Sequence, residues 1–237
     1  MERVQATVAG VRRWMLAPLL LGVFAGPAFA QQKGDWFAGG GLDDDKSVFG
    51  GVQYALPGSR LGSGWAVRGS AYTGSYSYVR DNHEIDADYT GGEAALLYQW
   101  SGAWGYADAG AIARYVDTDL SPYDRLNPRR GSQVSAAFSA EGMRIWGPWK
   151  LSGFAEYGVR IEDYLVRASL THQITDRLRL GLDTSTQGDE TYNRQHVGVL
   201  AGYAFTPSSE LQISTGLSRQ NSRSDRAYFG LLFNHAF

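Results

Sequence analysis

The sequence ends in YFGLLFNHAF, residues 228–237, in which apolar and small or polar side chains alternate up to a terminal phenylalanine. Successive side chains of a β-strand point to opposite faces, so this pattern predicts a strand. One face would carry Phe229, Leu231, Phe233 and Phe237, and the other would carry Tyr228, Gly230, Leu232 and Asn234. The last residues of a soluble domain usually fray. A final strand that stays apolar to its last residue raises the question of what it faces.

The same alternation recurs along the chain. In KLSGFAEYGVRI, residues 150–161, apolar or small residues alternate with Lys150, Ser152, Glu156 and Arg160. No stretch after residue 30 approaches eighteen consecutive apolar residues, so no membrane-spanning helix is expected there. The pattern predicts twelve strands, near residues 34–42, 47–55, 63–79, 86–100, 103–116, 131–146, 149–160, 163–173, 177–187, 192–205, 209–219 and 226–237.

Two architectures fit this alternation: a soluble β-sandwich with apolar faces inward, and a membrane barrel with apolar faces outward. Three features favour the second, an all-β, antiparallel up-and-down transmembrane β-barrel of about twelve strands. The strand count is even, and the links after odd-numbered strands include the long ones, residues 117–130 above all. Aromatic residues also gather at strand ends, as in a membrane-interface girdle. Tyr98, Trp100, Trp104 and Tyr106 flank one turn, and Trp146 and Trp149 flank the next.

The first thirty residues read as a secretory signal peptide. Arg3, Arg12 and Arg13 precede an apolar run over residues 14–24, and the AFA of residues 28–30 supplies a cleavage pattern. That run is too short to span a bilayer as a helix. We therefore expect residues 1–30 to be removed after Ala30, which leaves residues 31–237 as one outer-membrane β-barrel domain.

An exported chain whose last strand ends on an aromatic residue resembles bacterial outer-membrane proteins, whose assembly machinery reads that strand. We interpret Phe229, Leu231, Phe233 and Phe237 as this C-terminal assembly signal. The expected location is the bacterial outer membrane, and the expected partners are its lipid and the barrel assembly machinery. The formal net charge of −2 gives no electrostatic footprint for nucleic acid. The absence of cysteine excludes a disulfide framework and a thiolate metal site.

If the apolar faces meet lipid, the opposite faces line the lumen. The lumen-facing charged residues would be Glu93, Arg114, Glu141, Glu156, Arg160, Arg167, Arg179, Asp183 and Arg194, with Gln99 and Gln212 beside them. A buried charge costs several kcal/mol unless it is paired, so these groups either pair with one another or border water. Twelve strands make a barrel wider than the eight-strand kind and narrower than sixteen-strand porins. A thin channel and a closed interior both remain open.

Catalytic and metal-binding patterns are sparse. The histidines His83, His172, His196 and His235 show no metal-ligand spacing, so we expect no metal and no other cofactor. His172 and His235 would face outward near the rim that carries the termini, where we interpret them as interfacial residues rather than catalytic bases. The acidic turns at residues 43–45 and 84–88 lack a complete calcium-loop pattern, and we expect them to be solvated.

The stretch SPYDRLNPRRG, residues 121–131, resembles the P-x-D-P-x-N-P-x-x-G signature of the cellulose biosynthesis protein BcsS family. The matching residues are Pro122, Asp124, Asn127, Pro128 and Gly131, with Arg125 in place of a proline. Residues 177–199 resemble the family's Gly-Pro-Glu, Tyr and Arg-x-Gly pattern. Gly181, Tyr192 and Gly198 are retained there, whereas Leu182, Asp183 and His196 replace the proline, glutamate and arginine. The resemblance implies an outer-membrane protein tied to bacterial cellulose production, with cellulose or components of the cellulose-synthase complex as partners.

Three functions follow from these observations, in decreasing order of support. The first is a non-enzymatic outer-membrane accessory protein for cellulose biosynthesis, export or surface retention. The second is a small-solute porin, and the third is a lipid-modifying barrel enzyme. Within the first, the loop at residues 121–131 is stiffened by its prolines and rich in turn-forming residues. We expect it to fold over or into the barrel mouth, with a solvated surface loop as the alternative.

Overall fold

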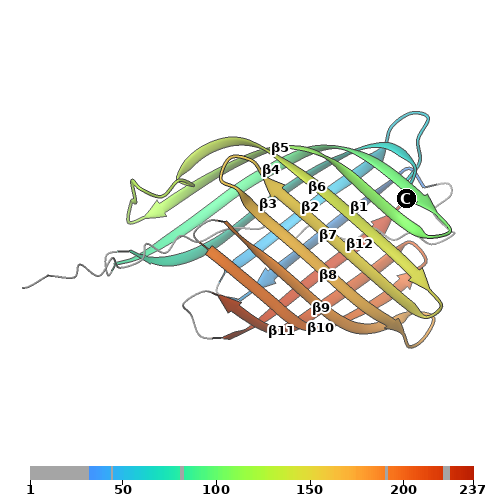
Figure 1. Ribbon diagram of the computed structural model, residues 1–237. Helices are drawn as coiled ribbons and strands as arrows, with labels where there is room; N and C mark the ends of the chain where they lie inside the picture. The colour runs from blue at the N-terminus through green and yellow to red at the C-terminus, as the bar shows by residue number, and fades with distance from the viewer. Residues whose placement is uncertain (1–31, 44, 81–82, 190–191, 221–224) are drawn as a thin grey trace, which may run out of the picture.

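The computed structural model describes residues 32–43, 45–80, 83–189, 192–220 and 225–237, and shows a closed antiparallel barrel of twelve strands. The strands are β1 (Gly34–Leu42), β2 (Lys46–Ala55), β3 (Gly64–Arg80), β4 (His83–Gly102), β5 (Gly105–Ser121), β6 (Gly131–Trp146), β7 (Trp149–Gly158), β8 (Asp163–Gln173), β9 (Leu178–Asp189), β10 (Tyr192–Thr206), β11 (Ser209–Gln220) and β12 (Arg226–Ala236). Each strand pairs with its neighbours in sequence, and β1 pairs with β12 (Figure 1). The predicted barrel and its twelve strands are confirmed.

The seam between β1 and β12 closes the barrel with backbone hydrogen bonds. Residues from Asp35 to Leu42 pair in register with residues from Ala236 back to Phe229. The terminal residue extends this seam, because the Phe237 N–H donates to Gly34 O at 2.8 Å. The Phe237 ring also lies over Gly34, where a Cβ would come within 2.6 Å of the ring. Closure leaves no unpaired sheet edge, as a sheet in lipid requires.

The two faces of the sheet separate outward and inward side chains as the alternation predicts. On β12, Phe229 and Leu231 are exposed whereas Tyr228, Leu232 and Asn234 are buried in the barrel. Outside the N-terminal segment, every tryptophan lies in the end of the barrel that holds the termini and is exposed there: Trp36, Trp65, Trp100, Trp104, Trp146 and Trp149. These rings form an aromatic belt of the kind found at a membrane-water interface.

Tyr106 does not belong to this belt, contrary to the prediction. It is 1% exposed inside the barrel, where its hydroxyl accepts from Gln99 Nε2 at 3.0 Å and donates to the Asp108 carboxylate. The strand period explains the difference. Tyr106 has the same parity as Arg114, and β5 turns both side chains into the lumen.

The strands differ twofold in length, which shapes the two ends of the barrel. β4 has 20 residues and β7 has 10, so at a rise of about 3.3 Å per residue they extend over roughly 66 and 33 Å. We call the end with residues 34 and 237 the termini end, at the right in Figure 1, and the opposite end the loop end. A membrane strand needs about 9–11 residues. The surplus of β3–β6 therefore extends the wall on one side.

The loop lengths agree only partly with the prediction. The loop-end connection at residues 122–130 is long, as expected, but β3 and β4 are joined by residues 81–82 alone, and β9 and β10 by residues 190–191. Residues 80, 83–85, 188 and 189 were expected to be loop, but they belong to strands because the hairpins extend past the shorter strands. No helix in the described part of the chain is long and apolar enough to cross a membrane. The proposed signal peptide, residues 1–30, lies outside the described residues.

Candidate functional site: the polar lumen wall

Arg114 on β5 is the centre of a buried ion cluster that joins four strands. Its Nε donates to Glu93 of β4 at 2.7 Å, its Nη1 donates to Asp163 of β8 at 3.0 Å, and its Nη2 donates to Glu156 of β7. The four side chains are between 3% and 14% exposed. We call these residues the Arg114 cluster. One guanidinium thus holds three carboxylates, the arrangement that a buried fork of donors favours.

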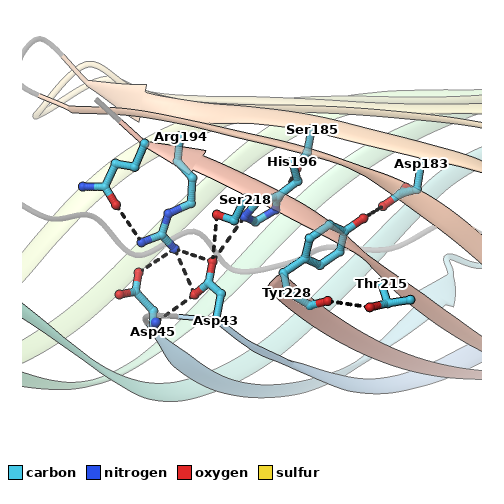
Figure 2. A network of polar contacts seen from close by, with 10 residues as sticks. Asp43, Asp45, Asp183, Ser185, Arg194, His196, Thr215, Ser218 and Tyr228 are labelled. Atoms are coloured by element: carbon cyan, nitrogen blue, oxygen red, sulfur yellow. Dashed lines mark hydrogen bonds and ion pairs between the residues drawn. The ribbon is translucent and has the colours of Figure 1, made fainter. Parts of the chain in front are cut away.

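A second network fastens the turn after β1 to the far strands β9–β12 (Figure 2). Arg194 Nη1 on β10 lies 3.0 Å from Asp43 and 2.8 Å from Asp45. His196 Nε2 lies 3.2 Å from the same Asp43 carboxylate, and its Nδ1 lies 3.2 Å from Ser185 Oγ. We call these residues the Asp43 network. Strands β12 and β11 lie between β1 and β10, and the network reaches across both. The turn that carries Asp43 and Asp45, which was expected to be solvated, is therefore held against the barrel wall.

Stacked rings continue the Asp43 network down the wall. The His196 ring stacks on Tyr228 at 4.7 Å with an interplanar angle of 17°. The Tyr228 hydroxyl reaches Asp183 at 3.5 Å, and Asp183 accepts from Arg167 Nε at 2.8 Å. Burial alone would raise the pKa of Asp43, but its contacts with His196 and Arg194 outweigh burial and hold the pKa below its usual value. Asp43 is therefore a carboxylate at neutral pH.

The loop at residues 122–130 is held by side-chain contacts to β3 and β9. Asp124 accepts from Arg80 Nη1 at 2.6 Å and from the Tyr78 hydroxyl at 2.9 Å. Asn127 Nδ2 donates to the same Tyr78 hydroxyl at 2.9 Å, and Arg129 Nη2 lies 3.4 Å from Asp189. Asp124, Asn127 and Arg129 are buried. The loop therefore folds inward at the mouth.

Local turns make this inward fold possible. Asp124 Oδ1 accepts from the Leu126 N–H, and Asn127 Oδ1 accepts from the Arg129 N–H, each at 2.9 Å. Such Asx turns reverse the chain within a few residues. Burial would raise the pKa of Asp124, but the Arg80 contact, the Leu126 N–H and the Tyr78 hydroxyl hold it below its usual value.

The remaining predicted lumen residues lie in different places. Glu141 is buried and Arg179 is half-buried, and both line a cavity near the termini end. Arg160 is an exception to the predicted network, because β7 ends at Gly158. It is exposed in the following turn, where Nη1 donates to Val134 O at 3.3 Å. The alternation of side chains cannot show where a strand ends, and Arg160 lies beyond the end of β7.

Several buried polar residues of the wall escaped the sequence analysis. Asp35, Arg68, Asp108 and Glu210 all face the lumen and are buried. Their parity along each strand would have identified them. Asp43 and Asp45 could not be found in this way, because their partner Arg194 lies about 150 positions further along the chain.

The family profile for cellulose biosynthesis protein BcsS matches residues 36–237, nearly the whole described chain. The chain belongs to this family. Among solved structures, the KdgM porin in complex with disordered oligogalacturonate is 6% identical, with a TM-score of 0.52, and the match covers 86% of this chain and 99% of that one. The translocator domain of autotransporter NalP from Neisseria meningitidis is 10% identical, with a TM-score of 0.53 and coverages of 89% and 91%.

A mutant of the monoaromatic hydrocarbon channel TodX is 6% identical to this BcsS protein, with a TM-score of 0.55 and coverages of 88% and 91%. These identities are low enough that the likeness shows the outer-membrane barrel fold alone. No curated protein sequence matches this chain.

Two positions that the sequence analysis expects to depart from the family's motif lie in or beside the Asp43 network of this BcsS protein. Asp183, at the glutamate position, pairs with Arg167, and His196, at the arginine position, contacts Asp43. In the other motif Asp124 and Asn127 are buried anchors, whereas Pro122, Pro128 and Gly131 are exposed. Gly131 has φ of +68°, a conformation that favours glycine, where the chain turns from the loop into β6.

Proposed function

We propose that this BcsS protein is a non-enzymatic accessory barrel of the outer membrane that assists the synthesis, export or surface retention of cellulose. The family match over residues 36–237 carries the proposal, because it ties the whole barrel to cellulose biosynthesis. The closed twelve-strand barrel with an exposed apolar outer face supports an outer-membrane location.

The orientation follows from export. A signal peptide at residues 1–30, cleaved after Ala30, would deliver the chain to the periplasm. The termini end with its tryptophan belt would then face the periplasm, and the loop end would face outside. Phe229, Leu231, Phe233 and Phe237 lie on the outer face of β12, where membrane lipid and the barrel assembly machinery would meet them. Membership of a cellulose biosynthesis family suggests cellulose, or components of its synthase complex, as partners.

The contacts of the charged groups support a role without catalysis. The Arg114 cluster and the Asp43 network tie strands and turns to one another through paired charges. The outward histidines lie at the termini end, where His172 packs edge-on against Trp149 at 4.7 Å and His235 contacts Ser209 at 2.8 Å. Such contacts are typical of side chains in an aromatic belt at a membrane interface.

Deletion of the gene tests this function. The expected result is a loss of cell-associated cellulose that the wild-type copy restores. Measuring both retained and released glucan separates the alternatives within the proposal. Normal retained and released cellulose in the deletion strain would refute it. A copy with Arg219 changed to alanine is the matched control, because Arg219 pairs with the exposed Asp225 and its own side chain is 72% exposed.

A small-solute porin is the second candidate, since the KdgM porin shares the fold and is described in complex with an oligosaccharide. Purified mature protein in planar lipid bilayers would distinguish the two. A porin conducts ions in steps of constant size. An accessory barrel held by its paired charges gives no such steps.

A further inference from the structure

The lumen widens into a cavity in its termini half, beside β6–β12. Polar, charged and apolar side chains from all of these strands line it. Its charged lining consists of Glu141, Lys150, Arg179 and Glu210, with Arg167 at its edge. The cavity shares only Arg167 with the pocket of the Asp43 network, so the two are separate sites.

Thr171 and Arg179 each bring to this lining a buried polar atom without a hydrogen-bond partner among the described residues. Thr171 is 4% exposed, and its Oγ1 makes no hydrogen bond. Arg179 Nη2 donates to Gln173 at 3.0 Å, whereas its Nη1 is buried and unsatisfied. A buried polar atom left without a hydrogen bond destabilises the fold. A ligand that offers oxygen atoms to both would remove that cost.

The charges of the cavity select the kind of ligand. Lys150 and Arg179 face Glu210, and Lys150 also interacts with Glu141, whereas Arg167 is paired with Asp183 outside the cavity, so each cation has a carboxylate of the protein nearby. An anionic ligand would meet two carboxylates. A neutral polyol instead offers hydroxyl groups that both donate and accept, which suits a wall of alternating donors and acceptors. Phe154, beside two leucines, gives an apolar patch for the C–H face of a sugar ring.

We propose that this cavity binds a neutral oligosaccharide, specifically a short segment of β-linked glucan. The cavity chemistry supplies the neutral polyol, and the identity of the sugar rests on the proposed function in cellulose biosynthesis. Thr171 and Arg179 are the residues that hold the sugar hydroxyls. The site lies on strand residues of the barrel wall, which keeps it fixed in place.

Isothermal titration calorimetry on the purified mature barrel tests the proposal. A zwitterionic detergent is needed, because a glycoside detergent would itself offer sugar hydroxyls. Cellotetraose is expected to bind saturably, and tri-galacturonate, an anionic sugar, at least about 10-fold more weakly. Thr171→Val and Arg179→Ala should each weaken cellotetraose binding at least about 10-fold, the loss of one hydrogen bond to a ligand. Arg177→Ala, an exposed arginine in the turn before β9, should leave binding unchanged.

Each other outcome overturns the proposal. No saturable binding of cellotetraose refutes the site, and equal or tighter binding of tri-galacturonate refutes its neutral ligand. Full binding by both Thr171→Val and Arg179→Ala places the sugar elsewhere. Thr171→Val preserves side-chain volume, so it tests the site even if loss of Arg179 prevents folding. Failure of the site and failure of the function are distinguishable. Loss of cellulose in the deletion strain without sugar binding refutes only the cavity, and the reverse result refutes only the role in cellulose biosynthesis.

Discussion

Removing Arg114 tests whether the ion pairs of the lumen hold the barrel together. Arg114→Met keeps much of the side-chain volume but leaves Glu93, Glu156 and Asp163 without their shared cation. Breaking a buried ion pair by removing one partner costs about 3–5 kcal/mol, because an uncompensated charge stays buried. We therefore expect the free energy of unfolding to fall by at least about 3 kcal/mol, a factor of roughly 100 in the unfolding equilibrium.

The assay is urea unfolding of the barrel in lipid vesicles, followed by tryptophan fluorescence and by the mobility of unheated samples in gels. Glu156→Gln in the Arg114→Met background removes one uncompensated charge and should restore at least about 1 kcal/mol. Arg219→Met is the matched control, because its pair with Asp225 is exposed to solvent and should contribute nothing measurable. A stability of Arg114→Met within about 0.5 kcal/mol of wild type, or no rescue by Glu156→Gln, would refute the reasoning.

Three further outcomes are expected. Because the pKa of Asp43 is lowered in the fold, its contribution to stability is fully present above about pH 4 and is lost as the pH falls further. The stabilities of wild type and Asp43→Asn should therefore differ at pH 7, and the difference should shrink as the pH falls below about 4. Asp124→Ala removes the contact with Arg80, so trypsin should cut the loop at Arg125 faster on intact cells than in wild type, and equal rates would contradict an anchored loop. Phe237→Ala keeps the backbone seam with Gly34 but removes the terminal ring, so it should lower the amount of folded barrel in outer-membrane fractions, and an unchanged amount would argue against an assembly signal.

The sequence was sufficient for those features that depend on one strand at a time. Alternation predicted all twelve strands, and the outward face of β12 is the one read from residues 228–237. Lipid on one side and the lumen on the other impose the period of 2 directly on each strand. Parity therefore also placed Glu93, Arg114 and Glu156 inside the barrel.

Partner choice was not predictable, because it depends on which strands the closed sheet brings near one another. Nothing local to residues 43–45 distinguishes a solvated acidic turn from one that binds Arg194 of β10. The lengths of the strands could not be predicted from the sequence either. β7 ends at Gly158 and leaves Arg160 in solvent, whereas β4 continues to 20 residues. Strand ends depend on the pairing of neighbours, and a period carries no information about them.

The position of His196 shows how a departure from the family pattern is accommodated. An arginine at position 196 would give the Asp43 network a second cation beside Arg194, which already pairs with Asp43 and Asp45. Histidine supplies the contact with Asp43 through Nε2 and stacks its ring on Tyr228, which passes the link on to Asp183. The network thus keeps its connection from the β1–β2 turn to β9. The acidic turn is held by the geometry that the ring provides as well as by charge.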